Sequence, residues 1–366
     1  MIPFLSFDYQ QKILGPKLIQ KTAEILEKKN YVLGSEVNLF EENFAQLTRI
    51  NHAIGVGSGL DGLVIALKAL GIKNGDEVIV PSNTYIASWL AISQLGAKII
   101  PVEPDPKTYN LDSLKIEEKI TSKTKVIMPV HLYGQACNMT QILKIAKKYD
   151  LFVVEDNAQS QLAKWDNQFT GSFGNANATS FYPTKNLGAI GEAGCITTNS
   201  REIMRFCKSY RNYGSEQKYI NKIKGVNSRI DELQAGFLNI KLEVLEKFTE
   251  ERILQASYYQ NNLPKVENLI LPYQEEASSS VFHLYVIQTP HRDKLQDYMN
   301  NKNIGTSIHY PIPPHLQKAY KELNFKKGDF PIAEKLANNL LSIPLYPGLK
   351  KSDQDYIIET INNYFK

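Results

Sequence analysis

Short apolar segments alternate with amphipathic segments through the first two thirds of the chain. Each apolar segment is followed by a polar or glycine-rich turn and then by a stretch with helical spacing of its apolar residues. The predicted strands cover residues 52–56, 77–80, 98–102, 125–130, 151–155, 177–180 and 196–198. Strands that alternate with helices predict an α/β fold with a mostly parallel central sheet, covered by helices on both faces.

The two ends of the chain follow other patterns. Residues 1–15 contain Pro3 and little helical period, which predicts an extended N-terminal arm, and Pro16 is expected to open a helix. A long helical pattern over residues 231–262 links a large domain, residues 16–245, to a small C-terminal α/β domain, residues 246–366. In the small domain we expect strands near residues 282–288 and 305–310 and helices over residues 292–301, 333–341 and 353–364.

Polar, aromatic and glycine residues follow the predicted strands at what should be one edge of the sheet. They are Gly57–Asp61, Tyr85, His131, Asp156 and Lys185. Ligands of such sheets bind beyond the carboxyl ends of the strands, so this edge is the predicted site. His131 carries the weakest argument, because a histidine at a strand end is often hydrogen-bonded only to its neighbours.

Lys185 lies in the segment NATSFYPTKNLGAIGEAG, residues 177–194, where glycines recur after the lysine. Glycines allow a flat ligand to approach the backbone. A lone lysine on a glycine-rich loop is usually a solvated surface residue, but here the earlier strand at 151–155 leads into Asp156. A strand-end acid followed by a strand-end lysine suits pyridoxal phosphate (PLP): the lysine forms a Schiff base and the acid pairs with the pyridinium nitrogen.

The segment GSGLDG, residues 57–62, joins a predicted strand to a predicted helix. Free backbone N–H groups and the helix dipole make such a turn an anion site. The segment lacks the Lys-Ser/Thr ending of a nucleotide triphosphate loop and the spacing of a dinucleotide fingerprint. A phosphate group is therefore favoured over a whole nucleotide, although many glycine-rich turns exist for steric reasons alone.

Composition narrows the class of protein. The chain has 366 residues, 43% of them hydrophobic and 22% charged, which is typical of a globular enzyme. A net charge of +4 is too small to indicate nucleic acid. The three cysteines, Cys137, Cys195 and Cys207, form no CxxC pair, so we expect neither a disulfide framework nor a metal site. The absence of a signal segment and of a long apolar run predicts a cytoplasmic protein without membrane contact.

Six motifs in order resemble the DegT/DnrJ-type nucleotide-sugar aminotransferases. They are GSGLDGL, PSNTYIAS, VHLYGQ, EDNAQ, SFYPTKNLG and NSRIDELQAG, and the resemblance extends over nearly the whole chain. Each motif is modest by itself, but the ordered set is specific. The resemblance implies the aspartate-aminotransferase-like PLP fold, fold type I.

The resemblance also implies roles for individual residues. Lys185 would carry PLP and move a proton, Asp156 would keep the ring nitrogen protonated, and Gln159 would bind the ring's 3-hydroxyl group. Tyr85 would stack on the ring. The phosphate would be held by the backbone at Gly59, Leu60 and Asp61, by the Ser180 hydroxyl, and by Asn227 of a neighbouring subunit. The implied assembly is a homodimer with shared active sites.

The implied reaction is transfer of an amino group from L-glutamate to C-3 of a dTDP-3-keto-6-deoxyhexose. The product would serve O-antigen, lipopolysaccharide or another surface glycan. Candidate substrate-binding residues are Lys218, Tyr219, Arg229, His309 and Tyr310. A C-4 aminotransferase of UDP- or dTDP-4-keto sugars stays open, as does a PLP-binding regulator. A sugar dehydratase of this family would need a histidine in place of Lys185.

The chain departs from the family pattern beside the predicted cofactor site. Asn157 stands where an alanine is usual, and Ser160-Gln161-Leu162 replaces a small residue followed by His-Gly. Leu60 stands where some relatives have a hydroxyl group, so its phosphate contact would come from the backbone alone. These changes affect the expected local packing and substrate fit, whereas Asp156 and Gln159 are kept.

Overall fold

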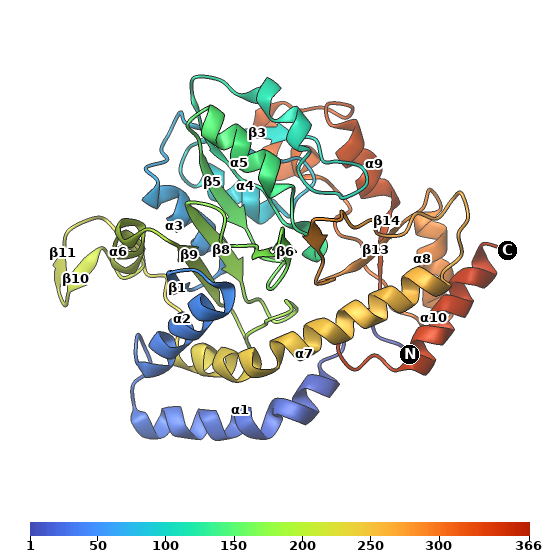
Figure 1. Cartoon of the computed structure of the whole chain (residues 1–366), viewed down its shortest axis with the longest axis horizontal. Coiled ribbons are helices and arrows are strands. Elements are labelled where there is room, and N and C mark those ends of the chain that lie inside the picture. Colours follow the sequence, from blue (N-terminus) through green and yellow to red (C-terminus); the bar gives the residue numbers. More distant parts are fainter.

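The computed structural model describes residues 1–366 (Figure 1). Its α-helices are α1 (Asp8–Lys28), α2 (Ser35–Thr48), α3 (Gly59–Ala69), α4 (Ile86–Ser93), α5 (Met139–Lys148), α6 (Arg201–Tyr210), α7 (Glu232–Asn262), α8 (Arg292–Asn301), α9 (Pro331–Asn339) and α10 (Lys351–Tyr364). Its strands are β1 (His52–Val56), β2 (Glu77–Pro81), β3 (Lys98–Val102), β4 (Thr124–Ile127), β5 (Phe152–Asp156), β6 (Lys164–Trp165), β7 (Gln168–Phe169), β8 (Ala176–Ser180), β9 (Gly194–Thr198), β10 (Ser215–Gln217), β11 (Ile220–Asn221), β12 (Ser278–Ser279), β13 (Tyr285–Gln288) and β14 (Leu340–Ile343). None of the helices combines the length and the apolar character that a membrane span requires.

Seven strands form the central sheet, in the order β1-β9-β8-β5-β4-β2-β3. Strands β8, β5, β4, β2 and β3 pair in parallel. Strand β9 is antiparallel to both of its neighbours, so β1 runs in the same direction as the other five. The expected mostly parallel sheet is confirmed, and the carboxyl ends of β1, β2, β4, β5 and β8 meet at one edge.

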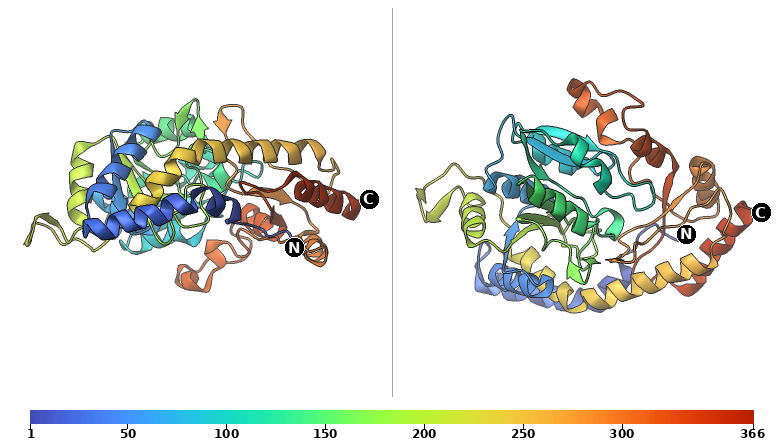
Figure 2. Two further views of the ribbon diagram at one scale, coloured as in Figure 1. Left: turned by 90° about the horizontal axis from the view of Figure 1, so that it is seen from below. Right: turned by 45° about the horizontal axis from the view of Figure 1, so that its top comes forward.

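Helices cover both faces of this sheet (Figure 2). Successive side chains of a strand point to opposite faces, and β2 shows the consequence. Val78 and Val80 pack in the apolar cluster that contains α3 and α4, whereas Ile79 packs in the cluster that contains α5. Helices α2 and α7 form a third apolar cluster with Ala53 of β1 and Cys195 of β9.

Helix α1 begins at Asp8, so the expectation of an extended arm over residues 1–15 is wrong for its second half. Pro16 lies inside the helix rather than at its start. Leu14 and Leu18 are buried in one cluster with residues of α7. The free energy gained by burying these two side chains outweighs the loss of the backbone hydrogen bond that Pro16 cannot make.

Helix α7 runs without a break through residue 245, where the boundary between the domains was expected, and the predicted helix over residues 231–262 is confirmed. Its buried Glu232 accepts hydrogen bonds from the N–H groups of Gly34, Glu36 and Val37, at 2.7, 2.9 and 3.0 Å. A helix N-terminus carries partial positive charge, so this carboxylate stabilises the start of α2.

The C-terminal part has its own apolar cluster, built from the end of α7 together with β13, β14, α8 and α10. The expected strand near residues 305–310 is wrong, because only Ser307 pairs with β14 and the His309 carbonyl accepts a hydrogen bond from Tyr133 instead of from a strand. The helix expected over residues 333–341 ends at Asn339, and the next residues form β14.

Candidate active site

Lys185 follows β8 in a tight turn, where its N–H group donates to the Tyr182 carbonyl at 2.9 Å. The side chain is partly buried and makes no hydrogen bond or ion pair within the chain. Burial lowers the pKa of Lys185 to about 8, and the negative charge of Asp156 opposes this shift. Near pH 8 about half of the amine is therefore unprotonated, which is the form that a nucleophile or a base requires.

Asp156 is the last residue of β5, and β5 pairs directly with β8. Its Oδ2 accepts a hydrogen bond from the Ser88 hydroxyl at 2.8 Å, and its Oδ1 accepts one from the Ala158 N–H at 3.1 Å. Burial raises the pKa of Asp156, while these two donors and the charge of Lys185 act in the opposite direction. The two strand-end groups thus lie close enough to influence each other, as the sequence predicted.

The start of α3 has the form of an anion site. Ser58 caps the helix by accepting a hydrogen bond from the Asp61 N–H at 3.1 Å. The first N–H groups of a helix, here those of Gly59 and Leu60, have no partner within it. A Cβ atom at Gly59 would lie 2.6 Å from the Cβ of Ser180, so only glycine allows this close approach. The Ser180 hydroxyl therefore lies directly beside the helix N-terminus.

The Asp61 side chain serves another purpose. Its Oδ2 accepts a hydrogen bond from the Ser228 hydroxyl at 2.7 Å, and Ser228 Oγ accepts one from the Gly57 N–H at 3.0 Å. These contacts fasten the segment that contains Asn227 to the phosphate turn. Asn227 itself is exposed, and its side chain makes no hydrogen bond.

Gln159 is buried at the same edge. Its Oε1 accepts a hydrogen bond from the Tyr133 N–H at 2.7 Å, and its Nε2 donates to the Tyr310 hydroxyl at 3.0 Å. The ring of Tyr310 lies 5.1 Å from that of the exposed Tyr85, with the planes tilted by 38°. The structure thus brings Gln159, Tyr85 and Tyr310 together. The interaction with Tyr133 was missed, because no sequence signal beyond its place in VHLYGQ marked that residue.

His309 comes from the small domain. Its Nδ1 lies 2.8 Å from the Ser342 hydroxyl. Burial, followed by the positive charge of Lys185, lowers the pKa of His309 to about 4. The imidazole is therefore neutral at physiological pH and lies within electrostatic reach of Lys185.

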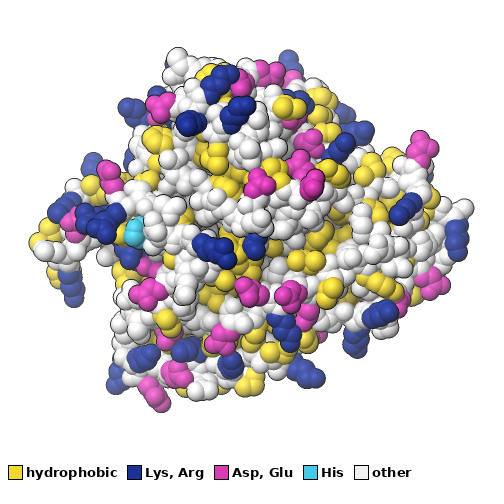
Figure 3. Space-filling view, viewed as in Figure 1, with side chains coloured by type: hydrophobic (Ala, Val, Ile, Leu, Met, Phe, Trp, Pro, Cys, Tyr) yellow, Lys and Arg dark blue, Asp and Glu magenta, His cyan; other side chains and the backbone are white.

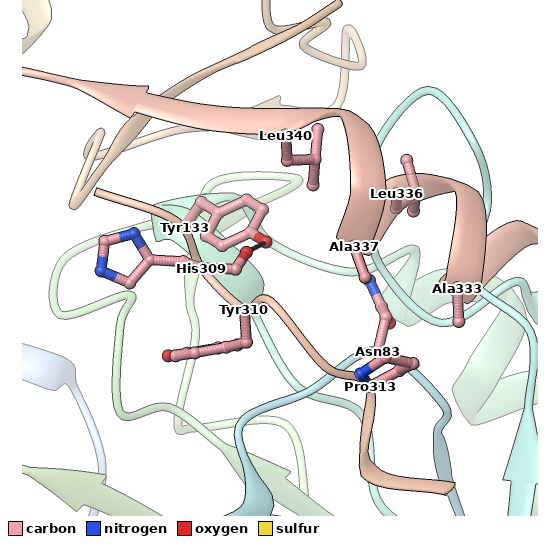
Figure 4. Close-up of a pocket in the computed structure, with 9 residues that line it drawn as sticks. All are labelled: Asn83, Tyr133, His309, Tyr310, Pro313, Ala333, Leu336, Ala337 and Leu340. Atoms are coloured by element: carbon pink, nitrogen blue, oxygen red, sulfur yellow. Dashed lines mark hydrogen bonds between the residues drawn. The ribbon is translucent and has the colours of Figure 1, made fainter. Parts of the chain in front are cut away.

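A small pocket borders this region (Figure 4). Its accessible volume is about 10 Å³, and it is lined by Asn83, Tyr133, His309, Tyr310, Pro313, Ala333, Leu336, Ala337 and Leu340. The Tyr133 hydroxyl points toward the His309 carbonyl and donates a hydrogen bond to it. The pocket brings both domains together, because α9 forms the wall opposite Tyr310.

His131 does not face the site. Its side chain is fully buried, with Nδ1 accepting from the Cys137 N–H at 3.0 Å, so Nε2 is the nitrogen that donates to Glu155 at 2.8 Å. The Glu155 carboxylate also accepts hydrogen bonds from the backbone of Gly171, Phe173 and Gly174. His131 therefore supports the loop behind the sheet, which is the local role that the sequence left open.

Lys218 and Tyr219 lie on the β10–β11 hairpin, which projects from the large domain beyond α6 (Figures 1 and 2). Tyr219 is 87% exposed. Lys and Arg side chains gather at this end of the molecule (Figure 3). No hydrogen bond connects the hairpin with Lys185 or Asp156 of the same chain. Arg229 donates to Asn212 Oδ1 at 2.8 Å and lies over the Tyr213 ring at 5.3 Å, at the base of this projection.

The residues that depart from the family pattern hold the turn after β5 together. Asn157 donates to Thr179 Oγ1 at 3.1 Å and accepts a hydrogen bond from Ser160. Gln161 donates to the Ser180 carbonyl at 2.8 Å. These side chains are buried, and Asn157 and Gln161 are bonded to β8, so they support the turn between Asp156 and Ser180.

The donors and acceptors at the edge fit PLP. An unpaired helix N-terminus and the Ser180 hydroxyl suit a phosphate group. An anchored carboxylate at Asp156 suits a protonated ring nitrogen, and Lys185 has the lowered pKa that an amine nucleophile needs. Gln159 Nε2 is a donor on the same edge.

Comparisons with known proteins agree with this geometry. Residues 12–362 match the DegT/DnrJ/EryC1/StrS aminotransferase family. The chain is 47% identical over 364 residues to the dTDP-3-amino-3,6-dideoxy-alpha-D-galactopyranose transaminase of Aneurinibacillus thermoaerophilus, covering 100% of this chain and 99% of that protein. It is 39% identical to a pleiotropic regulatory protein of Geobacillus stearothermophilus, with 100% and 99% covered. The crystal structure of S. venezuelae DesV in complex with a ketimine intermediate superposes with a TM-score of 0.97 at 39% identity, with 99% and 98% covered.

Proposed function

Because the chain belongs to the DegT/DnrJ/EryC1/StrS aminotransferase family and is thus a PLP-dependent aminotransferase, we propose that it transfers an amino group from L-glutamate to C-3 of a dTDP-3-keto-6-deoxyhexose. The product belongs to deoxyamino-sugar biosynthesis for surface glycans. The observation that carries the proposal is the Lys185–Asp156 pair in a chain that is 47% identical along its whole length to a transaminase named for a dTDP-3-amino sugar.

Each residue of the site has a defined task. Bound PLP supplies an electron sink for the substrate carbon that gains or loses nitrogen. Lys185 Nζ would move the proton at that carbon; in the cofactor-free chain its pKa is lowered to about 8, close to the pH at which it has to accept and release a proton. Asp156, whose orientation is set by Ser88 and Ala158, would keep the ring nitrogen in its protonated form. Gln159 Nε2 donates one hydrogen bond to the Tyr310 hydroxyl, and its second N–H would donate to the oxygen on the ring.

A homodimer is the proposed active unit. Large apolar or aromatic side chains remain exposed around the site and on the hairpin, namely Tyr85, Tyr182, Ile190, Tyr219 and Ile220. A second copy of the chain would cover them. The same arrangement would carry Lys218, Tyr219 and Asn227 toward the partner's site, where the hairpin and Arg229 would supply cations for a nucleotide diphosphate and Asn227 would complete the phosphate cup.

The substrate assignment is tested by offering dTDP-3-keto, dTDP-4-keto and UDP-4-keto sugars side by side with glutamate. We expect the dTDP-3-keto sugar to turn over fastest. Both substrates react in turn at one site, so ping-pong kinetics are expected, with glutamate competing against the keto sugar at high concentration. Equal or faster turnover of a 4-keto sugar would overturn the C-3 assignment and leave the amino-transfer chemistry in place.

A PLP-binding regulator is the second candidate, because one similar protein bears the name of a pleiotropic regulatory protein. The site argues against it. Ligand sensing does not need a lysine whose pKa is lowered toward neutrality or a carboxylate anchored by two donors, and both are present in Lys185 and Asp156. Cofactor binding without conversion of glutamate to 2-oxoglutarate would favour the regulator.

A further inference from the structure

Tyr133 occupies a rigid turn between β4 and α5. Its φ angle is 59°, in the left-handed region, and the following Gly134 has a φ of 101°. The Val281 N–H donates to the Gly134 carbonyl at 2.9 Å, and the Leu284 N–H donates to the Tyr133 carbonyl at 3.3 Å. The turn of the large domain is thus bonded directly to the segment that leads into β13 of the small domain.

Tyr133 donates two hydrogen bonds to different parts of the site. Its N–H donates to Gln159 Oε1 at 2.7 Å, and its hydroxyl donates to the His309 carbonyl (Figure 4). Gln159 Nε2 in turn donates to the hydroxyl of Tyr310 at 3.0 Å. Because His309 and Tyr310 are joined in the chain, the three contacts form a closed ring between the two domains.

The ring fixes the orientation of the Gln159 carboxamide. A backbone N–H can only donate, so the atom that faces Tyr133 is the oxygen, and Nε2 is left to donate on the other side. The His309 carbonyl is held in the same way by the only hydroxyl group bonded to it. Tyr133 thus fixes the position of both Gln159, which is assigned to the cofactor, and the His309–Tyr310 segment, which is assigned to the sugar.

We propose that Tyr133 is a positioning residue that fixes the His309–Tyr310 segment at the site through its hydroxyl and fixes Gln159 through its N–H. The kinetic part of this inference rests on the proposed function. Tyr133→Phe separates the two roles, because it removes the hydroxyl and keeps the backbone N–H. Tyr109→Phe is the matched control: Tyr109 is equally buried, its ring lies 6.0 Å from that of Tyr133, and its hydroxyl makes no hydrogen bond.

The first measurement is hydrogen exchange of the PLP-loaded enzyme, followed in peptides that cover residues 305–312. One hydrogen bond corresponds to a factor of about three to ten. We expect exchange in this segment to be faster by about that factor in Tyr133→Phe and unchanged in Tyr109→Phe. Unchanged exchange in Tyr133→Phe, or the same increase in both variants, would overturn the proposal that the Tyr133 hydroxyl holds this segment.

The second measurement separates the two half-reactions. Tyr133→Phe should raise KM for the keto sugar by about three- to tenfold, while the glutamate half-reaction and the pH titration of the cofactor absorbance stay as in the unchanged enzyme, because Gln159 keeps its N–H partner. Equal losses in both half-reactions would overturn the assigned role. If the unchanged enzyme does not transfer amino groups, the proposed function fails, and the hydrogen-exchange comparison still decides whether Tyr133 holds the segment.

Discussion

Lys185 is expected to destabilise the cofactor-free chain, so Lys185→Met should raise the free energy of unfolding. Below pH 8 the folded chain holds an ammonium group where burial lowers its pKa from 10.5 to about 8. That difference of about 2.5 pKa units corresponds to about 3 kcal/mol, and it already includes the attraction of Asp156. Methionine is similar in length and uncharged. We therefore expect the variant to be more stable by up to about 3 kcal/mol at neutral pH.

The pH dependence gives the sharper test. A lysine whose pKa is lower in the folded chain than in the unfolded chain costs stability in full below the folded value. The cost falls as pH rises from about 8 toward 10.5, because the unfolded chain binds more protons in that range. The difference in stability between Lys185→Met and the unchanged chain should thus be constant from pH 6 to 7.5 and should shrink above about pH 8.

Lys241→Met supplies the matched control. Burial also lowers the pKa of Lys241 to about 8, but its Nζ donates to the Gly188 carbonyl at 2.6 Å. Removing it leaves that carbonyl without its partner, which costs about 1–3 kcal/mol. Lys241→Met should therefore raise the free energy of unfolding much less than Lys185→Met does, although both replacements remove a buried cation.

The assay is urea unfolding of cofactor-free protein, followed by circular dichroism at one protein concentration, since association would shift the midpoint. A Lys185→Met variant that is no more stable than the unchanged chain at pH 7 would refute the reasoning. So would a stability difference that does not change between pH 8 and 10. Either result would mean that the ammonium group is solvated at the site.

Two further predictions concern the phosphate cup and the dimer. Gly59→Ala places a Cβ atom 2.6 Å from that of Ser180, so we expect PLP affinity, measured by titration of the cofactor absorbance, to fall by about tenfold or more, corresponding to about 1.4 kcal/mol; unchanged affinity would mean that α3 does not hold the phosphate. Mixing inactive Lys185→Ala with Asn227→Asp should restore part of the activity, because one site of a mixed dimer carries neither lesion; no recovery after demonstrated subunit exchange would place both residues in one chain's site.

The regular parts of the fold could be predicted because local pattern and tertiary packing agree in them. The strand over residues 52–56 and the helix over residues 292–301 have the bounds read from the sequence. The predictions are wrong where the local sequence pattern and the tertiary packing disagree. Pro16 indicated a helix start, but burial of Leu14 and Leu18 against α7 carries the helix back to Asp8. The segment 305–310 was expected to be a strand, but only Ser307 pairs with β14, and the His309 carbonyl accepts a hydrogen bond from the Tyr133 side chain instead.

The candidate site was predictable to the extent that topology alone assembles it. Parallel strands place their carboxyl ends together, so Asp156 and Lys185 had to meet at one edge once the strands were recognised. Contacts made by loops from the small domain follow no such rule. Gln159, Tyr133 and His309 come from three segments, and their hydrogen bonds depend on the left-handed turn at Tyr133.

The residues held by the central sheet and the residues contributed by the small domain have different parts in the proposed chemistry. Lys185 and Asp156 are held by the sheet, and in the proposed function they act on the carbon and the ring that every amino transfer shares. His309 and Tyr310, which the small domain contributes, are each joined to the large domain by one hydrogen bond, from Tyr133 and from Gln159. In the proposed function, a change in the sugar part of the acceptor is therefore expected to require changes at His309, Tyr310 and their neighbours, whereas the hairpin and Arg229 would bind the nucleotide diphosphate. Substitutions at residues 309–313 and along α9 should alter sugar preference while the glutamate half-reaction is retained.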